Sequence, residues 1–178
     1  MARHPATFSP DILAAIDRAL GDSSIVLDPF AGVGGIHQLR PKRYTLGVEI
    51  EQEWATENYL TVWGDSRDMW WVVRGSVDAI ATSPAYGNRM ADAYDGRDGS
   101  ERRTYRLALG RPLTKGNGAG VQWGQAYREL HCAVYRDCWR VLRPGGLFVL
   151  NMKDHIRGGK RQFVTAWHIE ALRGLGLR

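Results

Sequence analysis

Apolar runs that alternate with amphipathic stretches divide the chain into repeated strand–helix units. Short runs rich in Val, Ile and Leu predict five strands, at residues 25–29, 44–50, 60–62, 77–81 and 147–152. Amphipathic stretches predict helices at residues 10–20, 38–40, 51–59, 67–73, 126–142 and 163–172. Strands that alternate with helices favour a parallel sheet with helices on both faces. We therefore expect an α/β protein with a doubly wound, mostly parallel sheet, in one domain spanning residues 1–178.

Two local signals mark the ends of predicted helices. Ser9 followed by Pro10 is typical of a helix start, with the serine as N-cap and the proline in the first turn. The Arg-Pro-Gly-Gly run at 143–146 is typical of a helix end followed by a turn. Lys153-Asp154-His155 follows the last predicted strand, where it either borders a binding pocket or forms a simple turn.

Residues 87–123 interrupt this alternation. The stretch is long, rich in glycine and charge, and without clear periodicity, which is typical of a functional or a solvated loop. Its basic side chains and interleaved aromatic rings suit contacts with a nucleic-acid backbone and with bases; they are Arg89, Arg97, Arg102, Arg103, Arg106, Arg111, Lys115, Tyr94, Tyr105 and Trp123. We single out Arg102, Arg103 and Arg106 as candidate nucleic-acid contacts, with a solvated loop as the alternative.

Composition narrows the class of protein further. The 178 residues suffice for one domain with a sizeable core, and no apolar stretch has the length of a membrane span. The first residues lack the apolar segment of a signal peptide, so we expect a cytoplasmic protein without membrane contact. The spacing of Cys132 and Cys138 suits buried side chains, and the scattered histidines predict no metal site. The net charge of +5, with 20 arginines among 24 basic residues, is compatible with phosphate contacts.

A glycine-rich turn follows the first predicted strand. Its residues are Asp28-Pro29-Phe30-Ala31-Gly32-Val33-Gly34-Gly35. Glycines at this place let the backbone turn tightly and approach a ligand without a Cβ in the way. The turn departs from the dinucleotide fingerprint because Gln38 stands where the last residue should be small. Taken alone, such a turn is weak support for a binding site.

Acidic residues at the ends of the next two strands strengthen the prediction. Glu49 ends the second predicted strand, where a carboxylate can accept both hydroxyls of a ribose. Asp65 follows the third strand, where a carboxylate can reach an adenine amine. Together with Asp28, these carboxylates stand at three consecutive strand ends, which meet at one edge of a parallel sheet. The pattern predicts a site for a nucleoside cofactor.

A second turn, Thr82-Ser83-Pro84-Ala85-Tyr86, follows the fourth predicted strand. The Ser83 hydroxyl and the Pro84 carbonyl can each accept one hydrogen of an exocyclic base amine, and proline stiffens the turn that presents them. Tyr86 offers an aromatic face for an extruded base. For methyl transfer to such an amine, the remaining barrier is lowered by positioning the amine against the methyl donor. A plain Ser-Pro turn is the simpler interpretation of this segment alone.

The chain resembles the S-adenosylmethionine-dependent amino-methyltransferases of DNA, whose catalytic signature is D/N/S-P-P-Y/F. Matching segments are 4–10, 28–35, 47–50, 64–66, 82–86 and the Leu-Arg-Pro-Gly-Gly run at 142–146, in the γ-like order with the cofactor motifs first. The chain as a whole is similar to small DNA methylases of actinobacteriophages. The resemblance implies a class I (Rossmann-like) methyltransferase fold. It implies cofactor contacts at Phe8, Asp28, Phe30, Gly32, Gly34, Glu49, Asp65 and Ser83, and catalytic roles for Ser83, Pro84 and Tyr86.

Two features depart from the family. Ala85 stands where family members have a second proline, which loosens the turn without removing either acceptor. The family's sheet normally continues with a hairpin of two strands after the helix that follows strand five. Here the chain ends at Leu177-Arg178, so we expect those C-terminal strands to be missing and find no segment for a separate target-recognition domain.

We therefore expect an enzyme that uses S-adenosyl-L-methionine to methylate an exocyclic amine of a flipped DNA base, cytosine N4 before adenine N6. The C5 class of methyltransferase is disfavoured because it needs a cysteine nucleophile, usually after proline, and neither cysteine follows one. Two alternatives stay open. One is an RNA base amino-methyltransferase, and the other is a catalytically weak module that binds cofactor and nucleic acid.

Overall fold

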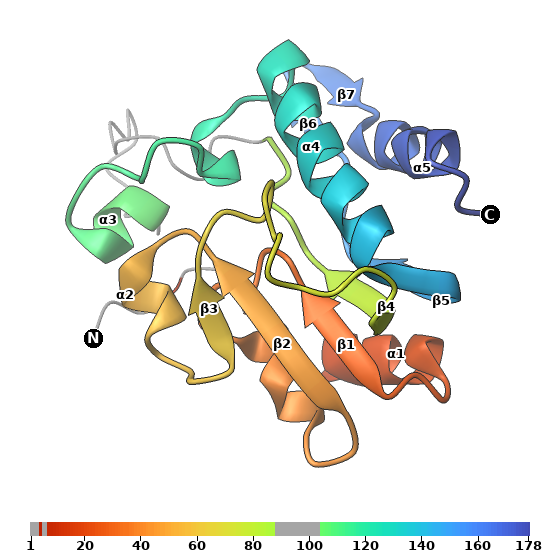
Figure 1. Ribbon diagram of the computed structural model, residues 1–178. Helices are drawn as coiled ribbons and strands as arrows, with labels where there is room; N and C mark the ends of the chain where they lie inside the picture. The colour runs from red at the N-terminus through yellow and green to blue at the C-terminus, as the bar shows by residue number, and fades with distance from the viewer. Residues whose placement is uncertain (1–3, 5–6, 88–103) are drawn as a thin grey trace.

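The computed structural model describes residues 4, 7–87 and 104–178 of the chain. Its main sheet contains β1 (Ile25–Asp28), β2 (Tyr44–Glu49), β3 (Thr61–Trp63), β4 (Val77–Thr82) and β5 (Leu142–Leu150). The strand order is β3-β2-β1-β4-β5, and every neighbouring pair is parallel (Figure 1). The order reverses between β1 and β4, which confirms the predicted doubly wound sheet.

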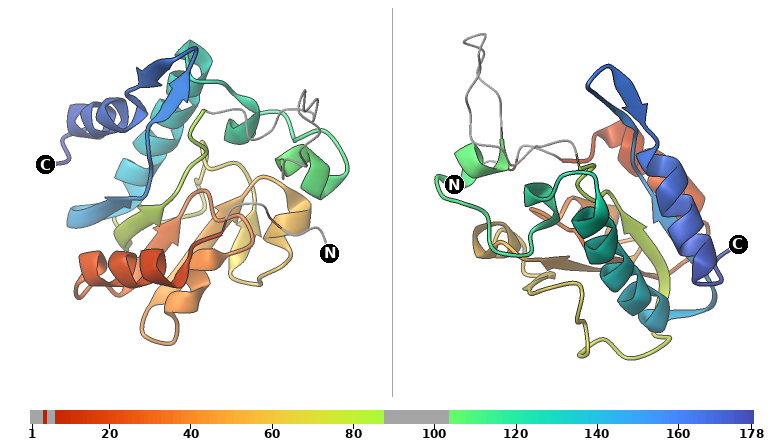
Figure 2. Two further views of the ribbon diagram at one scale, coloured as in Figure 1. Left: turned by 180° about the vertical axis from the view of Figure 1, so that it is seen from behind. Right: turned by 90° about the horizontal axis from the view of Figure 1, so that it is seen from above.

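Helices cover both faces of this sheet. The helices of the described residues are α1 (Pro10–Leu20), η1 (Gly35–Leu39), α2 (Gln52–Ala55), α3 (Tyr105–Leu109), η2 (Gly118–Gly120), α4 (Gln125–Val141) and α5 (Val164–Gly174), η denoting a 3₁₀ helix. Successive strand residues point to opposite faces, so Val26 packs in the α1 cluster while Leu27 packs in the α4 cluster. Figures 1 and 2 show α1 and α4 on these two faces.

The predicted start of the first helix is confirmed. The Ser9 hydroxyl accepts a hydrogen bond from the Ile12 amide at 3.3 Å, and Pro10 is the first helical residue. The predicted helix at 51–59 is shorter, because α2 spans only Gln52–Ala55.

The predicted helix at 67–73 is wrong, because this segment forms turns. Its backbone keeps one internal turn bond, from the Val72 amide to the Met69 carbonyl at 2.8 Å, and other bonds go to α4. The Arg140 guanidinium donates to the carbonyls of Met69 (2.7 Å) and Val72 (2.9 Å), and the Asp137 carboxylate accepts from the Met69 amide (2.5 Å). Tertiary partners have here replaced the local hydrogen bonds that a helix needs.

The Pro-Gly-Gly run lies inside β5 and does not form a separate turn. β5 begins directly after α4, and its pairing with β4 jumps from Val77–Leu142 to Ala79–Leu147. The proline and glycines lie in this irregular part, where they do not have to pair with β4 as residues of a regular strand would.

A hairpin of β6 (His155–Arg157) and β7 (Lys160–Gln162) follows β5 and was not predicted. Gly158 and Gly159 form its tip with φ of +57° and +73°, which two-residue hairpin turns require and glycine adopts readily. The hairpin is a separate antiparallel sheet before α5, so it is not the continuation that the family's main sheet has. Figure 1 shows it beside the start of α4.

Among the helices of the described residues, none combines the length and apolar character that crossing a membrane requires.

Candidate functional site

A cavity of about 190 Å³ lies at the carboxyl edge of the main sheet, where doubly wound proteins bind ligands. It brings together most of the residues that the sequence singles out: Phe8, Asp28, Phe30, Gly32, Glu49, Asp65, Ser83 and Tyr86 line it. Gly34 and Pro84 do not line it. The glycine-rich turn and the Ser-Pro turn thus open on the same space.

Asp28 connects the ends of β1 and β4. Its Oδ1 atom accepts from the Thr82 hydroxyl at 2.6 Å and from the Phe30 amide at 3.0 Å. The side chain is buried, and this burial raises the pKa of Asp28 to about 6. Asp28 therefore holds the two turns in a fixed relation.

The structure explains why glycine is needed at two positions of the first turn. Gly32 has a φ of +54°, and a Cβ there would lie 3.1 Å from the His4 ring. Gly34 has a φ of +78°, and a Cβ there would lie 2.5 Å from the His37 ring, closer than real contacts allow. Gly34 is thus required by turn geometry and packing against His37, and its predicted cofactor contact stays untested.

Glu49 is held at the end of β2 by backbone groups. Its Oε2 accepts from the Gly32 amide and its Oε1 from the Glu51 amide, both at 2.9 Å. The carboxyl is 8 % exposed, and this burial raises the pKa of Glu49 to about 7. Each oxygen has a further lone pair, so the carboxylate can also accept hydroxyls from the cavity side.

Asp65 already has a partner that the sequence did not suggest. Its carboxylate forms an ion pair with Arg67, with Nε 2.9 Å from Oδ1, and that hydrogen bond lowers the pKa of Asp65. The guanidinium also packs against Gly116, where a Cβ would lie 2.6 Å from it. Asp65 can bind an adenine amine only if its carboxylate accepts hydrogen bonds from Arg67 and from the amine at the same time.

Two phenylalanines contribute apolar walls to the cavity. Phe8 precedes α1 and packs against Gly35, where a Cβ would lie 3.0 Å from its ring. Phe30 follows β1, and its ring centroid lies 5.5 Å from that of His131 on α4.

Ser83 and Tyr86 face each other in the second turn. Their hydroxyl oxygens are 3.0 Å apart, and the Asn151 side-chain amide donates to the Ser83 hydroxyl at 3.2 Å. Asn151 follows β5, lines the cavity, and was missed by the sequence reasoning. Its position directly after a strand next to β4 was the available signal. Pro84 is buried, and its carbonyl accepts no hydrogen bond from the described part of the chain.

A chain of buried hydrogen bonds supports the Ala85 carbonyl from behind. The Tyr127 hydroxyl lies 2.7 Å from that carbonyl and 2.9 Å from His168 Nε2, and the Tyr135 hydroxyl lies 2.6 Å from His168 Nδ1. Burial lowers the pKa of His168 to about 3 and raises that of Tyr127, so both groups are neutral.

The hydrogen positions in this chain follow from its chemistry. A carbonyl only accepts, so Tyr127 donates to Ala85 and must accept from His168 Nε2–H. His168 Nδ1 then accepts from Tyr135. Each of the three side chains therefore donates one hydrogen bond: Tyr135 to His168, His168 to Tyr127, and Tyr127 to the Ala85 carbonyl.

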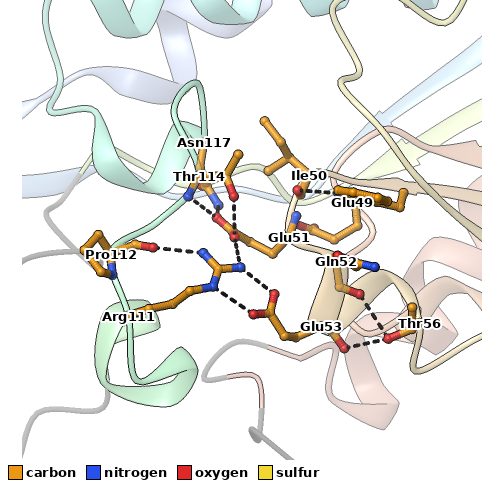
Figure 3. Close-up of polar contacts among 11 residues, drawn as sticks. Glu49, Ile50, Glu51, Gln52, Glu53, Thr56, Arg111, Pro112, Thr114 and Asn117 are labelled. Atoms are coloured by element: carbon orange, nitrogen blue, oxygen red, sulfur yellow. Dashed lines mark hydrogen bonds and ion pairs between the residues drawn. The ribbon is translucent and has the colours of Figure 1, made fainter.

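A network around Glu51 fixes the segment 111–117 beside the cavity (Figure 3). Glu51 is 0 % exposed, and its carboxylate accepts from the Thr114 amide, the Thr114 hydroxyl, the Asn117 side chain and Arg111, each at 2.8 Å. Arg111 also pairs with Glu53. Gly116, Asn117 and Gly118 line the cavity, so the network shapes one of its walls.

Burial alone would raise the pKa of Glu51, yet hydrogen bonds from Asn117, Thr114 and Arg111 hold it below its ordinary value. The sequence did not predict this network, because its members lie about sixty residues from Glu51 in the chain.

The predicted nucleic-acid contacts are only partly covered by the structure. Arg102 and Arg103 lie outside the described residues, and Arg106 is exposed on α3. The neighbouring Tyr105 is buried, lines the cavity and packs edge-on against Trp54.

Comparisons with known proteins bear on the fold. No protein-family model and no curated protein matches the chain. Among solved structures, a SAM-dependent methyltransferase of Thermotoga maritima described as a possible histamine N-methyltransferase is 13% identical, with a TM-score of 0.53, over 93% of this chain and 69% of its own. The [4+2]-cyclase SpnF is 12% identical, with a TM-score of 0.52, over 96% of this chain and 60% of its own.

The YcgJ protein of Bacillus subtilis is 16% identical, with a TM-score of 0.48, over 78% of this chain and 48% of its own. This chain thus spans about half to two thirds of the length of these three structures. With the sheet described above, the first two likenesses establish the class I Rossmann-like methyltransferase fold that the sequence predicted. One of the two is described as a cyclase, so the fold by itself does not decide the reaction.

Proposed function

We propose that this protein methylates an exocyclic amine of a DNA base, cytosine N4 before adenine N6, with S-adenosylmethionine as the methyl donor. One observation carries the proposal: the glycine-rich turn with Glu49 and the Ser83–Tyr86 turn line the same cavity. A site for a nucleoside cofactor and one amine acceptor, the Ser83 hydroxyl, are thereby in one cavity, and Pro84 follows Ser83 in the chain. The preference for cytosine rests on the resemblance, in which a Ser-Pro start is commonest among the cytosine-N4 enzymes.

The residues present fit the cofactor. Glu49 has acceptor capacity for the ribose hydroxyls, and Phe8 contributes an apolar wall. Asp65 would accept a hydrogen bond from the adenine amine while it keeps its ion pair with Arg67. When bound, S-adenosylmethionine supplies an electrophilic methyl group.

The second turn supplies the groups that handle the amine. Ser83 accepts one amine hydrogen, and Asn151 orients its hydroxyl by donating to it. The Pro84 carbonyl accepts the other hydrogen. Tyr86 presents its ring to the extruded base, and its hydroxyl then exchanges the bond to Ser83 for solvent. Drawing both hydrogens into these acceptors aims the nitrogen lone pair, which would otherwise be delocalised into the base.

The test is incubation with methyl-labelled cofactor and duplex DNA, single-stranded DNA or RNA, followed by digestion and identification of the labelled nucleoside. We expect N4-methylcytosine from DNA. Label in RNA alone would support the RNA alternative. Tight cofactor binding without transfer would support the binding module, and absence of cofactor binding would refute the proposal altogether.

Two variants test the assignment of the catalytic turn. Ser83→Ala loses an amine acceptor and Tyr86→Ala loses the stacking face, so both should lower transfer strongly. Ser83 is also one of the cofactor contacts that the resemblance implies, so Tyr86→Ala is the cleaner variant and should leave cofactor affinity nearly intact. A Tyr86→Ala protein that methylates as well as the parent would remove Tyr86 from the catalytic turn.

A further inference from the structure

The β6–β7 hairpin carries a concentration of positive charge. Residues 153–162 contain four basic side chains, Lys153, Arg157, Lys160 and Arg161, and one acidic side chain, Asp154. All four basic residues are exposed. The glycine tip has no side chains, so its backbone can approach a ligand closely.

Most of this charge is not neutralised within the described residues. Asp154 is occupied, because its carboxylate pairs with Arg161 at 2.8 Å and accepts from the Thr165 amide at 2.9 Å. Lys153, Arg157 and Lys160 form no ion pair with any described residue. Three basic groups therefore stay available to an anionic partner.

The pairing of the two strands places like charges together. Arg157 pairs with Lys160 across the hairpin, so the two side chains extend from the same face. Like charges directly opposite each other destabilise a strand pair. An anionic ligand that touches both would remove this repulsion, and guanidinium and ammonium groups suit phosphate oxygens.

The hairpin is anchored next to the proposed catalytic turn. Asn151, which donates to Ser83, precedes Lys153 by two residues, so the two Cα atoms are at most about 7 Å apart. The Arg157 guanidinium donates to the Gln122 side chain at 2.7 Å, just before α4 begins.

We infer that the β6–β7 hairpin binds the phosphate backbone of duplex DNA beside the base that enters the cavity. The inference rests on the proposed function and assigns the DNA contact to a segment other than 87–123. Lys153, Arg157 and Lys160 each contact a backbone phosphate. Such contacts position the duplex without reading its sequence.

The test compares two triple variants of equal charge. Lys153→Gln, Arg157→Gln and Lys160→Gln together neutralise the hairpin. The control variant, Arg18→Gln with Arg74→Gln and Arg136→Gln, removes the same charge. These exposed arginines lie on α1, in the turn before β4 and on α4, and none is ion-paired in the described structure. Fluorescence anisotropy with a labelled duplex measures affinity over a range of KCl concentrations, and calorimetry measures cofactor affinity.

We expect the hairpin triple to lower the slope of log K against log salt by about 2.7, at about 0.9 for each phosphate contact. The control triple should change the slope little, and cofactor affinity should be unchanged in both. The inference would be overturned if the parent and the hairpin triple had equal slopes, or if both triples lowered the slope equally. The proposed function would still stand in that case if the parent methylates DNA. A parent that binds only RNA would overturn the duplex assignment, and one that binds cofactor but methylates no nucleic acid would refute the proposed function instead.

Discussion

The most informative single substitution is Tyr127→Phe, which removes one hydroxyl from behind the catalytic turn. The ring stays, and it stacks on His131 with a centroid distance of 3.9 Å, so packing is preserved. The hydroxyl donates to the Ala85 carbonyl and accepts from His168, so its loss breaks two hydrogen bonds at once. The turn that presents the Pro84 carbonyl then loses its support from α4.

The size of the effect follows from the groups left without partners. The buried His168 Nε2–H loses its acceptor, and a buried polar group without a partner costs about 1–3 kcal/mol. The Ala85 carbonyl is only half-buried and can recover a bond to water, so its loss adds less. We expect the free energy of unfolding to fall by about 2 kcal/mol.

The effect on catalysis should be separate from this loss of stability. A looser turn misplaces the amine acceptors, and small misplacements in a catalytic site cost up to about a hundredfold in rate. We expect turnover to fall about tenfold, equivalent to about 1.4 kcal/mol in the barrier. Tyr127 does not line the cavity, so cofactor affinity should not change.

Tyr135→Phe is the matched control. It removes the hydroxyl at the other nitrogen of His168, which costs stability, but it keeps the bond between Tyr127 and Ala85. Urea unfolding and methyl transfer are measured on both variants at a temperature at which both are folded. Equal turnover in the two variants, or full turnover in Tyr127→Phe, would refute a positioning role for Tyr127.

Three further predictions test the cavity and its second turn. Glu51→Gln places an NH₂ group where an acceptor oxygen faces the Thr114 and Asn117 donors, and should lower stability by about 1–3 kcal/mol in urea unfolding. Because the folded pKa of Glu51 is lowered, its stabilisation should be present above its ordinary value of 4.5 and lost as pH falls below it, a loss the variant should lack. If the Glu49 carboxylate binds ribose, its pKa of about 7 predicts roughly tenfold weaker cofactor binding at about pH 6 than at pH 8; calorimetry of Glu49→Gln should show no such dependence. Ala85→Pro should raise turnover with unchanged cofactor affinity, because the Ala85 amide donates no hydrogen bond to a described residue; a folded variant that turns over no faster contradicts this.

The position of the site could be predicted because parallel strands fix it. Their carboxyl ends meet at one edge, so residues that directly follow separate strands converge without any knowledge of packing. Asp28, Glu49, Asp65 and Ser83 were found this way and do line one cavity. Asn151 follows β5 at the same edge and obeys the same rule, so it was accessible to that reasoning.

The partners of these residues could not be predicted, because side chains distant in sequence supply them. Local spacing gives no sign that Glu51 binds Thr114 and Asn117, or that Ala85 rests on Tyr127 of α4. The same cause explains the wrong helix at 67–73, whose backbone groups bond to Arg140 and Asp137. Periodicity indicates an element only where tertiary contacts do not compete for its backbone.

Glu49 and Glu51 show how such distant partners divide roles between similar residues. They are two positions apart and both buried, yet burial raises the pKa of Glu49, whereas the donors from segment 111–117 hold that of Glu51 below its ordinary value. Glu51 is saturated by its four donors and has a structural task, because it fixes one wall of the cavity. Among the described residues Glu49 accepts from two amides, and it keeps acceptor capacity toward the cavity. The segment that forms one wall of the cavity thereby also determines which of the two carboxylates is left for a ligand.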